Sequence, residues 1–549
     1  MKLLFKELAL ICLTAMALAY AACGGGDGDQ PPPATATQEA SPIITSSPVT
    51  PHPQTLTPTT IDAPIIDLAT DSSLMIVYAA GQGDLRSDQP GLAAGDINGD
   101  GIDDIVVGAR FADGPDDRED SGTAYLILGS QTPQASIDLA AGQQDATILG
   151  ARPGDGLGFS AAASDLNGDG VKDVVVAAPF AGPQDQPSSK PGRVYIIFGT
   201  SALPTRIDLA QDEADVTITG RGGGGFFGDS VASGDINGDG TADLIIGATF
   251  DSGPGGDGAP VRGGAVYVFF GRASWPQALS AGDGDIALFG ADEFDELGDF
   301  VTSGDINGDG FDDVIATAEA ADGPDNGRPT AAEVHVLFGG DSIEGTFQIA
   351  LGQQDLSVYG AKAQDTLGFS LAAGDIDGDG IDELIMGARL GDGPDDAVAE
   401  AGQVYIVPGS EQLPSTIDLA ELPDFVTAVY GQNTGSFLGS SETVADLDGD
   451  GYGELIMGTG FADAPSRADS GALYIVEALG GNGFVSVAGE ILLGLVYGSA
   501  SDDRLGGNVV TADFNGDGRL DLIAVAEGAA GPDDSRPGVG RVYVISPPR

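Results

Sequence analysis

The chain has 549 residues, and its 84 Asp and Glu against 22 Lys and Arg give a formal net charge of −62. This charge excludes non-specific nucleic-acid binding and argues against electrostatic docking on anionic lipid, because both need a basic surface. Hydrophobic residues still make up 42% of the chain and glycines number 87, which is typical of many short strands joined by turns rather than of disorder.

The N-terminal segment is typical of a signal peptide. Residues 1–22 begin with two lysines and continue as an apolar run too short for a membrane span. Small residues before Cys23 resemble the bacterial lipobox, although Tyr20 stands where that motif usually has Leu. The alternative is an ordinary cleavage site with an incidental cysteine. The resemblance implies secretion across the cytoplasmic membrane, lipidation of Cys23, and retention at the cell envelope or extracellular surface by that lipid alone.

A tether is predicted to follow the lipidated cysteine. Residues 23–61 are rich in Gly and then in Pro and Thr, and they have no apolar periodicity to bury. Such a segment is expected to be extended and solvated. The folded domain is therefore predicted to cover residues 62–549, and we expect it to be a monomer.

A nine-residue acidic motif recurs seven times in the folded part. The pattern Asp-x-Asn/Asp-Gly-Asp-Gly-x-x-Asp/Glu has intervals of 69, 70, 70, 70, 71 and 67 residues between successive copies. Calcium prefers six to eight oxygen ligands, and alternate residues of a curled loop can point inward to supply them. Position 6 is always Gly, which permits the sharp turn, and position 7 is expected to offer only its backbone carbonyl.

The predicted ligands are the residues at positions 1, 3, 5, 7 and 9 of each loop. They are Asp96, Asn98, Asp100, Ile102 and Asp104; Asp165, Asn167, Asp169, Val171 and Asp173; Asp235, Asn237, Asp239, Thr241 and Asp243; Asp305, Asn307, Asp309, Phe311 and Asp313; Asp375, Asp377, Asp379, Ile381 and Glu383; Asp446, Asp448, Asp450, Tyr452 and Glu454; and Asp513, Asn515, Asp517, Arg519 and Asp521. A single copy would equally suit a simple turn. Seven copies in register favour about seven structural Ca²⁺ ions.

Four short strands are predicted in each repeat of about 70 residues. An apolar strand such as 105–109 follows each acidic loop, a third has the form Gly-x-x-Tyr-apolar, and a fourth ends in Tyr/Leu-Gly. This pattern predicts an all-β, seven-bladed β-propeller of four-stranded blades. The last copy ends after its third strand at Tyr543, whereas an unmatched fourth strand, 75–78, precedes the first copy. The N-terminal strand is therefore expected to complete the last blade and close the ring.

Two further motifs in register carry a resemblance to a known family. Leu/Phe-Gly precedes six of the loops, as at Leu157-Gly158, and Gly-Ala follows some of the loops, as at Gly108-Ala109, with Ala177-Ala178 in its place after the second. These motifs resemble the FG-GAP repeat, which builds the N-terminal propeller of integrin α chains. The resemblance implies binding of an extracellular protein or glycan through a propeller face. This chain departs from the family in having the acidic loop in all seven blades and Gln89 in place of the first Leu/Phe-Gly.

No catalytic constellation can be identified, so we expect a binding or adhesion protein rather than an enzyme. His335 occupies the Tyr position of a third strand, where a packing role is expected. The Asp-Gly-Pro-Asp-Asp segments at 113–117 and 392–396 are interpreted as solvated turns, with further cation binding as the alternative. Two other hypotheses remain: a calcium-dependent propeller enzyme acting on polysaccharide as a lyase or hydrolase, and a purely structural envelope protein.

Overall fold

The computed structural model describes residues 63–85, 91–182, 190–222, 224–253, 262–477, 483–487 and 492–547. They belong to one compact unit, Thr59–Arg549. The predicted signal peptide, Cys23 and the tether lie outside the described residues, as does Gln89. Within the described part, no helix has the length and apolar character needed to cross a membrane.

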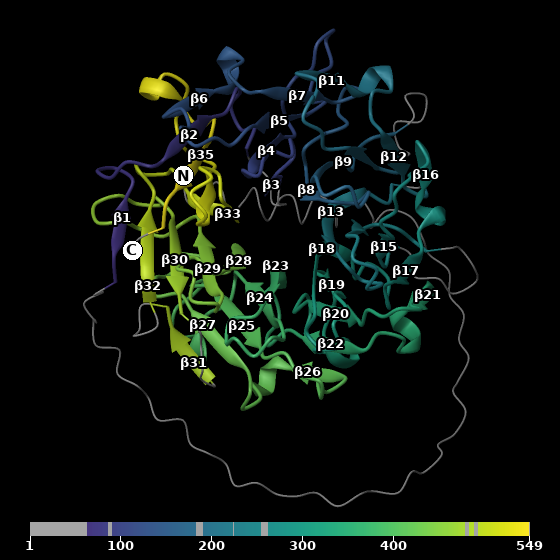
Figure 1. Cartoon of the computed structure of the whole chain (residues 1–549). Coiled ribbons are helices and arrows are strands. Elements are labelled where there is room, and N and C mark those ends of the chain that lie inside the picture. The colour runs from purple at the N-terminus through teal and green to yellow at the C-terminus, as the bar shows by residue number, and fades with distance from the viewer. Residues whose placement is uncertain are drawn as a thin grey trace, which may run out of the picture. The chain divides into compact units, whose positions relative to one another are not determined.

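Among the described residues, 35 strands form seven sheets, and Figure 1 shows these sheets arranged around a common axis. The blades are numbered here by their acidic loops, from blade 1 (Asp96) to blade 7 (Asp513). The first strands, nearest the axis, are β3 (Leu92–Gly95), β8 (Ala161–Ser164), β13 (Phe227–Gly234), β18 (Leu297–Gly304), β23 (Leu367–Gly374), β28 (Ser441–Ala445) and β33 (Leu505–Ala512). The second strands are β4 (Asp104–Ala109), β9 (Asp173–Ala178), β14 (Asp243–Ala248), β19 (Asp313–Ala318), β24 (Glu383–Ala388), β29 (Glu454–Thr459) and β34 (Asp521–Ala526).

The outer half of each blade contains the third and fourth strands. The third strands are β5 (Thr123–Ile127), β10 (Arg193–Ile197), β15 (Ala265–Phe269), β20 (Glu333–Leu337), β25 (Gln403–Val407), β30 (Ala472–Val476) and β35 (Arg541–Ile545). The fourth strands of blades 1 to 6 are β7 (Ala146–Leu149), β12 (Val216–Thr219), β17 (Ile286–Phe289), β22 (Leu356–Tyr359), β27 (Thr427–Tyr430) and β32 (Leu492–Tyr497), and that of blade 7 is β2 (Met75–Tyr78).

The prediction of four-stranded blades is wrong by one strand. Every blade has a short fifth strand that pairs in parallel with its fourth strand. In blades 1 to 7 these are β11 (Arg206–Asp208), β16 (Ala278–Ser280), β21 (Gly345–Gln348), β26 (Thr416–Asp418), β31 (Gly483–Ser486), β1 (Ile65–Asp67) and β6 (Ser136–Asp138). Six of them come from the connection between the third and fourth strands of the next blade, and β1 directly precedes β2, the fourth strand of blade 7. Neighbouring blades are therefore joined by a shared sheet edge.

Short 3₁₀ helices lie in two kinds of connection. One kind directly follows a fifth strand: η1 (Leu139–Ala141), η2 (Leu209–Gln211), η3 (Ala281–Asp283), η5 (Ile349–Leu351) and η7 (Leu419–Glu421). The other lies between a second and a third strand: η4 (Pro324–Asn326), η6 (Pro394–Asp396) and η8 (Pro532–Asp534).

The hydrophobic core lies between neighbouring blades. All six residues of each second strand are buried, because these strands are apolar on both faces and each blade packs against two others. One cluster joins Val106 and Leu126 of blade 1 to Val174 and Val176 of blade 2. Full burial of each such side chain contributes about 1.5–3 kcal/mol.

The N-terminal strands close the ring, as predicted. β2 pairs antiparallel with β35 and places Val77 opposite Val542, so 75–78 completes blade 7. β1 pairs in parallel with β32 of blade 6 and places Ile66 opposite Val496. Residues 65–78 therefore contribute strands to two different blades.

Candidate metal centres

The seven acidic loops join the first to the second strand of each blade, so all of them lie at one end of the ring. In the first loop, Asp96 accepts hydrogen bonds from the backbone N–H groups of Gly99 (2.7 Å), Asp100 (3.0 Å) and Gly101 (2.8 Å). Gly101 has a φ of +84°, a conformation that favours glycine. Equivalent bonds to the first Asp recur in every loop. The seven loops therefore fold alike.

The ninth residue of each loop begins the second strand and is buried. Asp104, Asp173, Asp243 and Asp313 have no exposed surface. Burial raises the pKa of the first three to about 7 and that of Asp313 to about 8. No Lys or Arg of the described chain forms an ion pair with these four carboxylates. These carboxylates do accept backbone hydrogen bonds, as Asp104 does from Ile97, Asn98 and Gly129, and a proton or a bound cation would stabilise them further.

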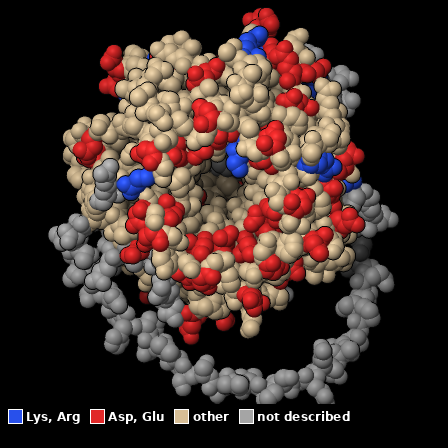
Figure 2. All heavy atoms as spheres, viewed as in Figure 1, with Lys and Arg blue, Asp and Glu red and all other residues tan. Residues whose placement is uncertain are grey.

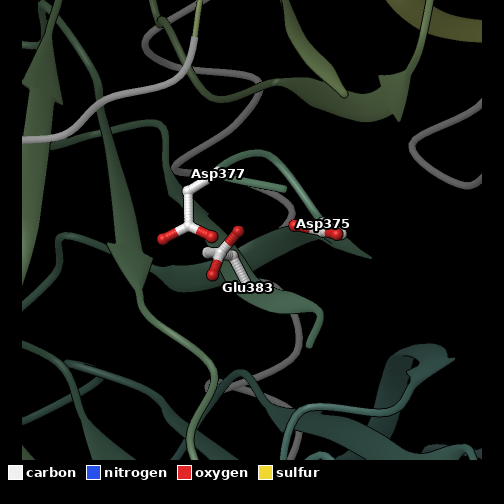
Figure 3. A group of neighbouring side chains, drawn as sticks. All are labelled: Asp375, Asp377 and Glu383. Carbon is white, nitrogen blue, oxygen red and sulfur yellow. The ribbon is translucent and has the colours of Figure 1, made fainter. Parts of the chain in front are cut away.

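Three carboxylates converge in each of the two loops that end in Glu. The ligand oxygens of Asp375, Asp377 and Glu383 all lie within 4.8 Å of one another, and Figure 3 shows the three side chains around one point of the loop. Asp446, Asp448 and Glu454 form the equivalent group in blade 6.

The fifth position of the loop lies outside both carboxylate groups. Its carboxylate caps the loop instead: Asp379 accepts a hydrogen bond from the N–H of Ile381 (2.9 Å), and Asp450 accepts one from Tyr452 (2.9 Å). Of the five predicted ligands, the structure therefore gathers positions 1, 3 and 9 in these two loops.

The donor set of the loops fits a hard cation. Carboxylate and amide oxygens occupy positions 1, 3, 5 and 9, a backbone carbonyl is available at position 7, and the pattern contains no sulfur or imidazole ligand. Oxygen-only sets of this kind suit calcium or magnesium rather than zinc or copper. The acidic clusters can therefore hold a metal ion, and positions 1, 3 and 9 would be its principal ligands in blades 5 and 6.

Neighbouring loops are hydrogen-bonded to one another around the ring. The N–H of the eighth residue donates to the carbonyl of the first residue of the preceding loop, as from Lys172 to Asp96 (2.9 Å). Among the described residues this bond is present at six of the seven joints: Asp103 to Asp513, Lys172 to Asp96, Ala242 to Asp165, Asp312 to Asp235, Asp382 to Asp305, and Gly453 to Asp375. The loops therefore form a nearly continuous chain rather than seven separate sites.

Side chains at position 7 strengthen the same joints. A Cβ added to Gly238, the fourth residue of its loop, would lie 2.4 Å from the ring of Phe311 in the next loop. Ile381 and Tyr452 cover the equivalent glycines, Gly308 and Gly378. Sequence reasoning assigned position 7 only a backbone role. The structure shows that its side chain packs on the neighbouring loop in several blades, while position 4 has a positive φ in every loop, which favours Gly.

The opposite end of the ring contains Arg–Asp ion pairs between blades, which sequence reasoning missed. Arg118, in the connection between β4 and β5, donates to both oxygens of Asp208 (2.7 and 2.9 Å) and to the carbonyl of Gly150 (2.6 Å). Both side chains of the pair are 9% exposed. Asp208 ends the fifth strand that blade 2 supplies to blade 1, so the pair holds that strand in place.

Four blades have this Arg latch, a name used here for an Arg in the second connection bound to the Asp that ends the fifth strand. The pairs are Arg118–Asp208, Arg328–Asp418, Arg467–Asp67 and Arg536–Asp138. In the other three blades the fifth strand ends in Ser280, Gln348 or Ser486, which cannot form an ion pair.

The Asp-Gly-Pro-Asp-Asp segments are turns, and the one at 113–117 directly precedes the latch residue Arg118. Asp113 accepts a hydrogen bond from the N–H of Asp120 (2.9 Å), and Asp392 accepts one from the N–H of Glu400 (2.7 Å). The first Asp therefore closes each loop through the backbone. His335 lies in β20 as predicted, where it is buried and its Nδ1 lies 2.9 Å from the hydroxyl of Ser357.

Seven sheets around one axis, each with an acidic loop between its first two strands, define a seven-bladed β-propeller. Seven stretches, together more than half of the chain, match the FG-GAP repeat: residues 90–127, 157–197, 227–269, 297–337, 367–407, 438–476 and 505–545. The chain belongs to the FG-GAP repeat family, as its motifs predicted.

Relatives of the chain include phospholipases and integrin alpha chains. It is 26% identical over 419 residues to phosphatidylinositol-glycan-specific phospholipase D of Bos taurus, covering 74% of this chain and 46% of that protein. It is 29% identical over 244 residues to integrin alpha pat-2 of Caenorhabditis briggsae, covering 43% and 18%. The chain thus spans less than half the length of these relatives. The structure of the biofilm matrix protein Bap1 of V. cholerae aligns with 88% of this chain and with 90% of its own chain. The sequence identity is 14% and the TM-score is 0.33.

Proposed function

We propose that this protein is a calcium-stabilised binding module, held at the cell surface by a lipid on Cys23, that recognises an extracellular protein or glycan through one end of its propeller. The observation that best supports this proposal is the contrast between the two ends of the ring. One end repeats the same acidic loop in all seven blades. The other end varies from blade to blade, and variable loops on a rigid scaffold are where binding residues concentrate.

Calcium is proposed for all seven loops. The supporting evidence is the oxygen-only donor pattern, together with buried ninth carboxylates whose pKa is raised by burial. A bound cation would supply the positive charge that keeps these carboxylates ionised at neutral pH. It would also offset part of the net charge of −62, which otherwise opposes a compact fold.

The end opposite the acidic loops is proposed as the binding end. Phe111 and Phe294 lie in connections at that end and are 44% and 42% exposed. The Arg110 guanidinium carbon lies 4.4 Å from the centre of the Phe111 ring. Exposed aromatic and Arg side chains contribute most of the energy at many interfaces. On the face shown in Figure 2, acidic side chains are more abundant than basic ones.

Binding without turnover is proposed for this chain. The buried His335 is already hydrogen-bonded, so its environment suits packing better than proton transfer to a substrate. The name of the bovine relative describes an enzyme, but the chain covers only 46% of that protein. Incubation with a panel of polysaccharides tests this point, because release of reducing or unsaturated ends would show that the chain is an enzyme.

The proposed function is tested by affinity capture. The tagged protein is exposed to cell-surface and medium fractions of its own organism in calcium, and in parallel after chelation. We expect a specific protein or glycan to be retained in calcium and released by chelation, as the loops lose their order. Failure to retain any component in calcium, with the protein shown to be folded, would overturn the proposal.

A further inference from the structure

An open cavity of about 450 Å³ lies between blades 6 and 7 at the end opposite the acidic loops. Its walls come from three distant parts of the chain: the turn after β1 (Leu68), the connection that follows β32 (Ser499 and Asp503), and the second connection of blade 7 up to β35 (Asp534 and Arg541). Because β1 comes from the N-terminus, this cavity forms only when the ring is closed. Its volume is typical of a small-molecule site.

Arg541 has donor capacity left for a ligand in this cavity. Its Nε donates to the carbonyl of Ala530 (2.5 Å), and its Nη1 donates to the hydroxyl oxygens of Ser499 (3.2 Å) and Tyr543 (3.0 Å). These bonds occupy three of the five guanidinium N–H groups. The remaining nitrogen, Nη2, forms an ion pair with Asp534 at 3.6 Å, which is too long for a hydrogen bond. The guanidinium is thus held by its other nitrogens, while Nη2 faces only this exposed carboxylate.

Two carboxylates stand beside this guanidinium. Asp534 is 88% exposed and can change rotamer without loss of packing. Asp503 is only 4% exposed, and one of its oxygens accepts hydrogen bonds from the Ser499 hydroxyl (2.5 Å) and the Ala500 N–H (2.8 Å). Two carboxylates would repel an anionic ligand while only one Arg attracts it, and the guanidinium would repel a cationic ligand. A neutral ligand rich in hydroxyl groups is repelled by neither.

We propose that this cavity binds a neutral sugar unit, with adjacent ring hydroxyls bridging Arg541 and Asp534. One hydroxyl oxygen accepts from Nη2 of Arg541, and the neighbouring hydroxyl donates to the Asp534 carboxylate. The residues equivalent to Arg541 are Thr123, Arg193, Ala265, Glu333, Gln403 and Ala472, so only blade 2 has an Arg at the same position and this chemistry is not a property of every repeat. The inference rests on the proposed function, for which it names a glycan as the partner.

The test is a titration of the calcium-loaded full-length protein with neutral hexoses and N-acetylhexosamines, followed by ligand-observed NMR. The Asp534→Ala variant is expected to weaken binding by about tenfold or more, because a hydrogen bond to a charged group is lost. Asp533→Ala is the matched control, since this neighbour is also exposed and does not line the cavity. It is expected to bind as the parent protein does.

A second variant separates binding from folding. Arg541→Met is expected to abolish binding, and circular dichroism reports whether the ring remains closed. Sugar binding that both variants leave unchanged would overturn this cavity as the site, while the proposed function would stand. Binding of uronic acids in place of neutral sugars would overturn the ligand class. If no neutral sugar binds but affinity capture still yields a protein partner, this inference alone fails.

Discussion

The two ends of the propeller hold neighbouring blades together in different ways. At the acidic-loop end, the same backbone hydrogen bond links successive loops at six of seven joints, and position-7 side chains cover the glycines of the preceding loop. At the other end, Arg latches join only four of the seven pairs of blades. The uniform end is a scaffold, and the uneven end leaves room for blade-specific features such as the cavity beside Arg541.

Removal of calcium is expected to have the largest effect, and it should act on the acidic-loop end first. Each site at a hundredfold excess over its Kd contributes about 2.7 kcal/mol, so loss of several sites should lower the Tm by roughly 10 °C or more. Calorimetry with and without chelator measures this change. Hydrogen exchange should then show lost protection at 96–104 before 113–120. An unchanged Tm would refute a structural metal.

Removal of one latch should have the next largest effect. Arg118→Met leaves the buried Asp208 carboxylate with only the exposed Arg206 as a charged partner, which is expected to cost about 1–3 kcal/mol of unfolding free energy. The control is Lys362→Met, which breaks an ion pair with Asp396 whose side chains are 47% and 61% exposed. This control should cost less than about 1 kcal/mol. Urea unfolding in saturating calcium measures both. Equal costs would mean that the latch is not a structural element.

Crowding a joint between two acidic loops should have a smaller effect. Gly238→Ala places a methyl group 2.4 Å from Phe311, whereas Gly449, at the same position of the sixth loop, has no neighbour within 4 Å. Both glycines have positive φ (+72° and +84°), so both variants include a similar backbone cost. We expect Gly238→Ala to lose about 1–3 kcal/mol more than Gly449→Ala in calcium-saturated unfolding experiments. Equal losses would show that the packing of Phe311 on Gly238 contributes nothing to the free energy of unfolding.

The pH dependence of stability should differ between metal-free and calcium-loaded protein. In metal-free protein the folded state binds protons more tightly than the unfolded chain, because burial raises the pKa of Asp104, Asp173 and Asp243 to about 7 from an ordinary value near 3.9. Stability should therefore fall as pH rises from about 4 to about 7. Calcium-loaded protein should not lose stability over this range. Thermal melts of both forms between pH 5 and 8 check the prediction.

The latch provides an internal contrast in melts that are extended below pH 4. The Arg118 side chain lowers the pKa of Asp208, so this pair stabilises the folded state above the ordinary Asp pKa and the contribution is lost as pH falls below it. A metal-free protein that becomes more stable as pH rises from 5 to 7 would contradict the assignment of the buried ninth carboxylates as the dominant titrating groups.

Local repetition made most of the fold predictable. The acidic motif located each turn between the first and second strands, and the unpaired segment 75–78 located the closure because Tyr543 ended a repeat without a fourth strand. The fifth strands were missed since three residues are too few for an alternating pattern to be distinctive. Their partners also lie in another blade, so no local signal reports the pairing.

The sequence does contain a motif that marks four of the fifth strands. Ile-Asp-Leu-Ala occurs at 66–69, 137–140, 207–210 and 417–420, and these are the four fifth strands whose Asp binds a latch Arg. The motif and its Arg are far apart in the chain, 90 residues in the case of Arg118 and Asp208. Only the ring geometry brings them together. The convergence of acidic side chains in blades 5 and 6, by contrast, follows from spacing within one loop and could be predicted.

The position of β1 has a mechanical consequence. Any tension applied through the preceding residues reaches Ile65–Asp67 first, and this strand is held by a three-residue parallel pairing and by the ion pair between Asp67 and Arg467 (2.5 Å). Detachment of β1 would remove the Leu68 wall of the cavity while the pairing of β2 with β35 still kept the ring closed. Under tension, β1 should thus detach first and β2 should separate from β35 later. The first step would change which ligands the protein can bind before the propeller itself opens.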